Sequence, residues 1–140
     1  MAANNQFSIA AHLMAGLGFC PNATPRTSAE LAGSVNTSPS FIRRTLAKLS
    51  KAGLIETAKG KHGYCRLARK PAEISLLDIY EAVDAPKAFS IHHYEASKPC
   101  AVSCNIKVAL ENALGRTQQA MEQSLAQITL ADLISDIQSH

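Results

Sequence analysis

The chain of 140 residues has no tryptophan, and only 5% of its residues are aromatic. Its apolar residues are mostly Ala, Leu and Ile, which favour helices over a β-sandwich or a barrel. No uncharged apolar run approaches the roughly 18 residues of a membrane span, and no signal-peptide pattern opens the sequence. We therefore expect a cytoplasmic, mainly α protein with one small domain and an extension.

Cysteine is also scarce. Four cysteines in 140 residues are too few for a disulfide scaffold, and in a cytoplasmic chain we expect them to be reduced. No Cys-x-x-Cys spacing occurs, which argues against a thiol oxidoreductase. We predict that Cys20 and Cys65 are structural, and that any chemistry at Cys100 and Cys104 is sensing or ligation.

The two halves of the chain carry net charge of opposite sign. Residues 1–71 hold ten Lys and Arg against two Asp and Glu, a net +8, whereas residues 72–140 hold four against nine, a net −5. Nine of the fourteen basic residues lie between Arg43 and Lys70. Such a concentration is typical of a surface that neutralises phosphates, and the alternative is an ordinary solvated basic face.

Two helices are predicted before this basic segment. The apolar residues of 5–19 recur at helical spacing. Thr27 and Glu30 have the spacing of a capping box, in which the hydroxyl accepts an early amide N–H and the carboxylate reaches back. We expect this box to open a short second helix that ends at Gly33.

A third helix, over 40–52, is predicted to be the main functional element. Its N-cap is Thr37 or Ser38, and Pro39 lies near its first position, where the missing amide N–H costs nothing. Its apolar residues recur at spacings of three and four and face inward, which leaves the basic residues largely on other faces. Gly53 is expected to end this helix.

A basic hairpin follows the third helix. Two strand-like runs, over 54–58 and 64–67, flank a glycine-bounded tip. In a helix-turn-helix with such a wing, the second helix reads base edges in the major groove of double-stranded DNA, and the wing contacts the backbone or the minor groove. The predicted DNA-binding residues are Thr37 and Ser38 at phosphates, Ser40, Arg43 and Arg44 at bases, and Lys48, Lys51, Lys59, Lys61 and His62 for electrostatic affinity.

The acidic half is predicted to begin with a helix capped by Ser75 and to continue through a loop-rich connector over 85–99. The longest helix runs from 105 to about 127 and carries an apolar stripe about six turns long. A last short helix follows Thr129. The stripe could fold back onto the helix over 5–19 or pair with its copy in another chain, and we favour pairing because one small domain cannot easily cover it.

The expected fold class is mainly α with a small β-hairpin, a winged helix-turn-helix plus a long C-terminal dimerisation helix. Three segments are predicted along the chain. They are a winged helix-turn-helix DNA-binding domain at 1–84, a connector or sensor loop at 85–104, and a dimerisation helix with a short C-terminal helix at 105–140.

Two runs of the sequence carry a family resemblance. They are SFIRRTLAKLSKAGL at 40–54 and, after Gly60, RLARKPAEISLLDIY at 66–80. Both closely resemble the Rrf-two family of winged-helix transcription regulators, and the resemblance covers nearly the whole chain, most of all to the YwnA-type branch. It implies a homodimer whose long helices cross, with each subunit presenting one recognition helix and one wing to a roughly palindromic operator.

The resemblance also bears on individual residues. Ser40, Arg43 and Arg44 match positions that read DNA in the iron–sulfur regulator IscR, but the identities differ, so we expect a different operator. Relatives that bind an iron–sulfur cluster carry three cysteines before the long helix, and Cys100 lines up with the last of them. Two thiolates, Cys100 and Cys104, are too few for a cluster with four, so no cofactor is expected.

Other roles for the two connector thiols stay open. His92 and His93 could complete a mixed zinc or iron site with them, because imidazole and thiolate suit both metals. A redox switch is another interpretation, since the dipole at the amino end of the long helix stabilises a thiolate at Cys100 or Cys104. In a third, both thiols are without a signalling role.

We therefore predict a cytoplasmic, homodimeric, sequence-specific DNA-binding regulator without enzymatic activity. We expect it to act as a repressor on a palindromic operator, and a response to redox state or a metal through Cys100 and Cys104 stays one of the open interpretations. The main alternative is a protein-interaction adaptor that keeps the winged-helix fold but no longer reads DNA.

Overall fold

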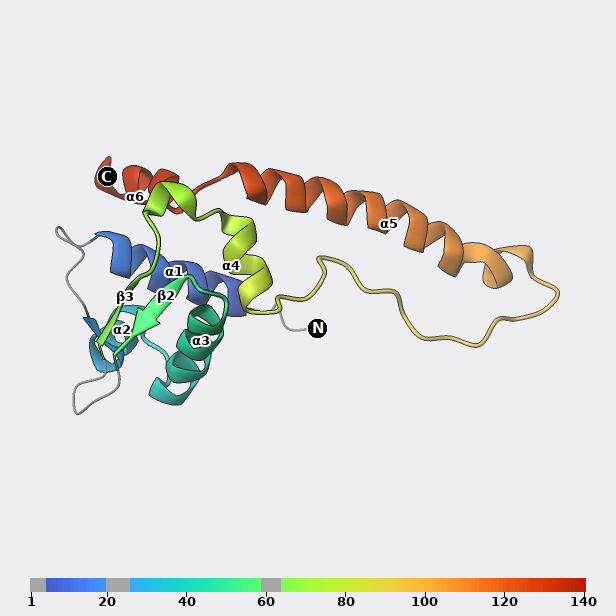
Figure 1. Ribbon diagram of the computed structural model, residues 1–140. Helices are drawn as coiled ribbons and strands as arrows, with labels where there is room; N and C mark the ends of the chain where they lie inside the picture. Colours follow the sequence, from blue (N-terminus) through green and yellow to red (C-terminus); the bar gives the residue numbers. More distant parts are fainter. Residues whose placement is uncertain (1–4, 20–25, 59–63) are drawn as a thin grey trace. The chain divides into compact units, whose positions relative to one another are not determined.

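The chain forms two compact units in the computed structural model, which describes residues 5–19, 26–58 and 64–140. One unit comprises residues 1–85 together with 125–140, and the other comprises residues 86–124. No described helix has both the length and the apolar character that a membrane crossing requires. The fold is mainly α with one small antiparallel sheet, as predicted (Figure 1).

A helix-turn-helix forms the centre of the first unit. Helix α1 (Gln6–Phe19) contacts α2 (Ser28–Val35) and α3 (Pro39–Lys51). Fully buried side chains from these helices make up much of the core, and they include Leu13, Met14, Leu31, Ile42 and Leu49. The inward-facing apolar positions of α3 therefore fix its orientation and leave its polar face outside.

Helix α2 is longer than the sequence suggested. Thr27 caps it as predicted, because its Oγ1 accepts the N–H of Glu30 at 3.1 Å. The prediction that Gly33 ends the helix is wrong. The helix continues to Val35 and ends where Asn36 turns left-handed, with φ 60°, and donates its N–H to the carbonyl of Ala32.

Both ends of α3 confirm the local signals. Ser38 is the N-cap, and its Oγ accepts the N–H of Phe41 at 3.2 Å. At the other end Gly53 has φ 78° and donates to the carbonyl of Ser50, while Leu54 donates to that of Leu49. This pair of bonds is a Schellman motif, which needs a residue at positive φ and so favours glycine.

The hairpin belongs to a three-stranded sheet of order β1-β3-β2. Strands β2 (Ile55–Thr57) and β3 (Tyr64–Leu67) pair antiparallel as expected, with Glu56 opposite Arg66. Strand β1 (Arg26–Thr27) pairs with the other edge of β3 and was not predicted. Two residues are too short a run for a period of two to be visible in the sequence.

The rest of the first unit closes over α1. A short 3₁₀ turn, η2 (Pro71–Glu73), precedes α4 (Leu76–Ala82), and α6 (Leu130–Gln138) follows the long helix. Complete capping boxes open α4 and α6, from Ser75 and Thr129. Leu130 and Ile134 of α6 are buried against the core, so residues 125–140 are part of this unit, whereas the sequence grouped them with the long helix.

The second unit consists of a connector and most of α5 (Ala101–Gln127). The connector contains no regular helix or strand up to Cys100. Helix α5 begins four residues before the predicted start at 105, which places Cys104 inside its first turn. None of its residues is buried, although the predicted apolar stripe runs along it.

Candidate nucleic-acid interface

The exposed face of α3 carries most of the predicted DNA contacts. Ser40, Arg43 and Arg44 are exposed, and the helix contains no acidic residue. Thr45 is buried and donates its Oγ1–H to the carbonyl of Phe41 at 2.9 Å, so this polar residue belongs to the core side. The helix therefore presents cationic groups on a rigidly packed support.

The remaining α3 candidates lie around that face. Lys51 is exposed, whereas Lys48 and Thr37 are half-buried. Ser38 is exposed, but its oxygen already accepts the Phe41 N–H. The hydroxyl hydrogen of Ser38 stays available to donate to a phosphate oxygen, because a serine can donate and accept at once.

An aromatic contact on α3 was missed in the sequence. The guanidinium carbon of Arg44 lies 5.7 Å from the ring centroid of Phe41, one turn earlier on the helix. This distance is within the range of a cation–π interaction. The spacing of Phe41 and Arg44 could have indicated this contact, since residues three apart on a helix are neighbours.

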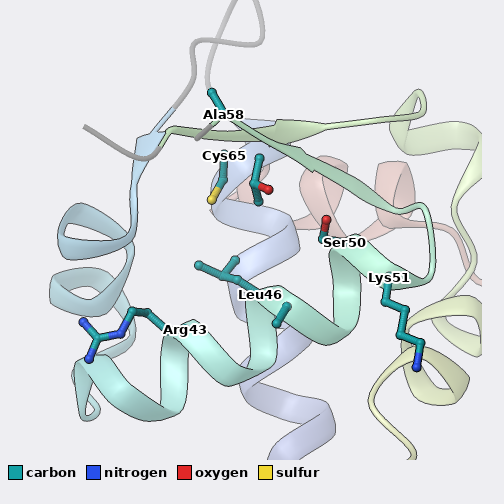
Figure 2. Close-up of a pocket in the computed structure, with 8 residues that line it drawn as sticks. Arg43, Leu46, Ser50, Lys51, Ala58 and Cys65 are labelled. Carbon is teal, nitrogen blue, oxygen red and sulfur yellow. The ribbon is translucent and has the colours of Figure 1, made fainter. Parts of the chain in front are cut away.

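A hollow of about 490 Å³ separates α3 from the hairpin. Figure 2 shows the Cys65 side chain pointing from β3 toward α3, while Arg43 and Lys51 extend away from the hollow at its two ends. Cys65 is 4% exposed, and burial raises the pKa of its thiol. The structure thus supports a structural role for Cys65, because a raised pKa keeps the thiol in its less reactive form.

The strands of the wing carry an exposed ion pair. Arg66 pairs with Glu56 across the strands, with its Nη2 2.8 Å from the carboxylate, and both side chains are more than half exposed. The predicted tip contacts Lys59, Lys61 and His62 lie outside the described residues. The sequence did not single out the Glu56–Arg66 pair, which only the strand register brings together.

The two connector thiols, Cys100 and Cys104, are free and exposed, one turn apart at the start of α5. The sulfur of Cys100 accepts the N–H of Ser103 at 3.4 Å, and the Cys104 N–H bonds to the Cys100 carbonyl at 3.1 Å. Cys100 thus lies directly before the helix, and its carbonyl accepts the first helical N–H, that of Cys104.

The histidines of the connector are not gathered with these thiols. His92 instead stacks on Tyr94, with ring centroids 4.9 Å apart. Within residues 5–19, 26–58 and 64–140, no three His, Cys, Asp or Glu side chains are grouped as a metal site. The alternative mixed site of His92, His93, Cys100 and Cys104 is therefore not formed in this structure.

Comparisons with known proteins agree with this geometry. The Rrf2 (Rrf-two) family model, described as "Iron-dependent Transcriptional regulator", matches residues 3–136. YwnA of Bacillus subtilis is 32% identical over 135 residues, which span 96% of this chain and 98% of YwnA. The HTH-type transcriptional regulator NsrR of Geobacillus kaustophilus is 31% identical over 113 residues, 76% of this chain and 71% of NsrR.

A solved structure shows the same fold. IscR from T. potens matches with a TM-score of 0.72 and 20% sequence identity, over 98% of this chain and 88% of IscR. Sequence and structure thus confirm the resemblance that the residues 40–54 and 66–80 indicated. The chain belongs to the Rrf2 family, whose model is described as that of a transcriptional regulator.

Proposed function

We propose that the protein is a homodimeric, sequence-specific DNA-binding repressor that reads a palindromic operator with α3 and contacts the backbone with its wing. The observation that carries this proposal is the cationic face of α3, in which Ser40, Arg43 and Arg44 are exposed on a helix without acidic residues. Arginine can read guanine with two hydrogen bonds in the major groove.

The roles of the other residues follow from their positions. Thr37 and Ser38 are placed at the N-terminus of α3, where amide N–H groups and the helix dipole favour a phosphate. Lys48 and Lys51 lie in its last turn and supply electrostatic affinity. We assign the same role to the three basic residues of the wing tip, Lys59, Lys61 and His62.

Dimerisation is supported by the apolar stripe of α5. Ile106, Leu110, Leu114 and Met121 recur along one side of the helix, and none is buried within one chain. Val102, one turn before Ile106, is 69% exposed. A second copy of α5 would cover this stripe, and a dimer with two-fold symmetry calls for an operator with matching half-sites.

A redox response through Cys100 and Cys104 completes the proposal. Both thiols are exposed and one turn apart. Hydrogen peroxide would join them in a disulfide, and the two thiol hydrogens would leave with the peroxide oxygens as two water molecules. The test compares DNA affinity before and after peroxide in the unaltered protein and in Cys100→Ser, which is expected to abolish the response.

The iron dependence named in the family description is not matched by a cluster with four thiolates among the described residues. A cluster with four protein thiolates needs more ligands than Cys100 and Cys104, and Cys65 is buried against α3 in the other unit. We therefore assign no step to a cluster or to iron.

A selection experiment tests the proposed function. The protein is used to enrich duplexes from a random-sequence library, and its affinity for the enriched duplex and for a scrambled one is measured by fluorescence anisotropy at several salt concentrations. The proposal predicts a preference of at least about 1,000-fold and an affinity that falls with salt. Equal affinity for both duplexes would reject it.

A further inference from the structure

We propose that Phe41 is a positioning residue that orients the Arg44 guanidinium for base readout and so sets part of the sequence selectivity. This inference rests on the proposed function. Phe41 is the third residue of α3, half-buried, and its ring centroid lies 5.7 Å from the guanidinium carbon of the exposed Arg44. The two residues belong to the same end of the helix, where side chains reach farthest into a groove.

The backbone of Phe41 is held on both sides. Its N–H donates to the Ser38 Oγ at 3.2 Å, and its carbonyl accepts the Oγ1–H of Thr45 at 2.9 Å. Thr45 is 2% exposed, so this second partner is fixed within the core. The phenyl ring therefore projects from an anchored first turn of the helix.

Among the described residues, no carboxylate forms an ion pair with Arg44. Helix α3 contains no acidic residue, and the ion pairs found in the described ranges join Arg66 with Glu56 and His140 with Asp136. A ring contact engages the flat face of a guanidinium and leaves its N–H edge free. That edge is the part that hydrogen-bonds to guanine in the major groove.

Arg43 differs from Arg44 in this respect. It lines the hollow between α3 and the hairpin and extends away from it at one end (Figure 2). The ring contact found on α3 is that of its neighbour. We infer that Arg44 provides selectivity at one base position, whereas Arg43 contributes affinity with less dependence on sequence.

A double-mutant cycle tests this assignment. The affinities of Phe41→Leu, Arg44→Ala and the double variant are measured for the enriched and the scrambled duplex by anisotropy. Phe41→Leu is expected to weaken binding to the enriched duplex by about two- to fivefold, as for an exposed cation–π contact, with little change for the scrambled duplex. In the Arg44→Ala background the same substitution should have no further effect.

Two further variants separate orientation from folding. Phe41→Tyr keeps the aromatic ring and should restore the selectivity that Phe41→Leu loses. Phe7→Leu is the matched control, because Phe7 is also a half-buried phenylalanine but pairs with Tyr80, and it should leave selectivity unchanged. The melting temperature of each variant reports any loss of folding.

The outcomes distinguish the inference from the function on which it rests. If Phe41→Leu weakens binding equally with and without Arg44, or if Phe41→Tyr fails to restore selectivity, the positioning role is wrong while the proposed function stands. If the unaltered protein shows no preference between the two duplexes, the proposed function fails and this inference fails with it.

Discussion

The two units of this chain differ in how much of their apolar surface a single copy can bury. The winged-helix unit has a closed core in which Leu13, Ile42 and Leu49 are fully buried. Helix α5 has no buried residue despite its apolar stripe. The winged-helix unit therefore completes its core within one chain, whereas α5 leaves its apolar stripe without a buried position, as the proposed pairing with a second copy requires.

The largest expected effect comes from opening the closed core. Leu49→Ala should lower the free energy of unfolding by about 2–5 kcal/mol at any protein concentration, because it removes a fully buried side chain and leaves a cavity. Urea denaturation at two concentrations measures this. The matched change Leu110→Ala on α5 should lower stability only by favouring dimer dissociation, so its effect should depend on protein concentration. A loss of stability that is the same at both concentrations would contradict the contrast between the two units.

Charges placed in the α5 stripe should separate the copies. We expect Leu110→Asp combined with Leu114→Asp to weaken self-association by about 100-fold or more, because carboxylates would be buried in an apolar contact. Sedimentation velocity reports the oligomeric state. Asn112→Asp adds a charge to an exposed position off the stripe and should leave the assembly intact. A dimer that survives the double substitution would rule out this interface.

Replacing an arginine on α3 should weaken DNA binding, whereas replacing one on α5 should not. Arg44→Ala is expected to cost about 1–3 kcal/mol of binding to the enriched duplex, or about 5- to 150-fold. Arg116→Ala removes the same side chain from an exposed position of α5 and should change affinity by about twofold or less. Equal losses would contradict the assignment of base readout to α3. An adaptor that does not read DNA would keep its protein partner in both variants.

The smallest effect is expected at the wing. Glu56→Gln should change stability by less than about 1 kcal/mol, because the Glu56–Arg66 pair is exposed. It also releases Arg66 from a carboxylate, so DNA affinity should rise slightly and its dependence on salt should steepen by about one phosphate contact. Anisotropy across a salt series measures both, and a fall in affinity would show that the pair shapes the wing.

Local signals in the sequence predicted much of this fold. The hydroxyls of Ser38, Ser75 and Thr129 begin helices as expected, because an N-cap depends on residues at most three positions away. The end of α3 at Gly53 is confirmed for the same reason. The family resemblance is confirmed by the match over residues 3–136.

The misplaced boundaries depend on contacts that are distant in sequence or on unusual backbone. Strand β1 forms because β3 offers it an edge some 40 residues later. Helix α5 starts early where Ser103 accepts the Ser97 N–H at 2.7 Å and its carbonyl accepts the Tyr94 hydroxyl at 2.7 Å. Neither the β1–β3 pairing nor the hydrogen bonds of Ser103 can be read from the spacing of apolar residues in the sequence.

The sequence predicted which residues make up the candidate site, but not the contacts between their side chains. Helical spacing placed Ser40, Arg43 and Arg44 outside the core, and the structure finds them exposed. The contact between Phe41 and Arg44 depends on rotamers, and the pair of Glu56 with Arg66 depends on strand register. Such details decide which charges are available to DNA.

The central claim is that two winged-helix units, joined through α5, read one palindromic site. Sedimentation equilibrium of the protein with the enriched duplex tests it most directly. We predict two chains per duplex, with a preference over scrambled DNA that is lost when Arg43 and Arg44 are both replaced by alanine. One chain per duplex, or a preference that survives this replacement, would contradict the account.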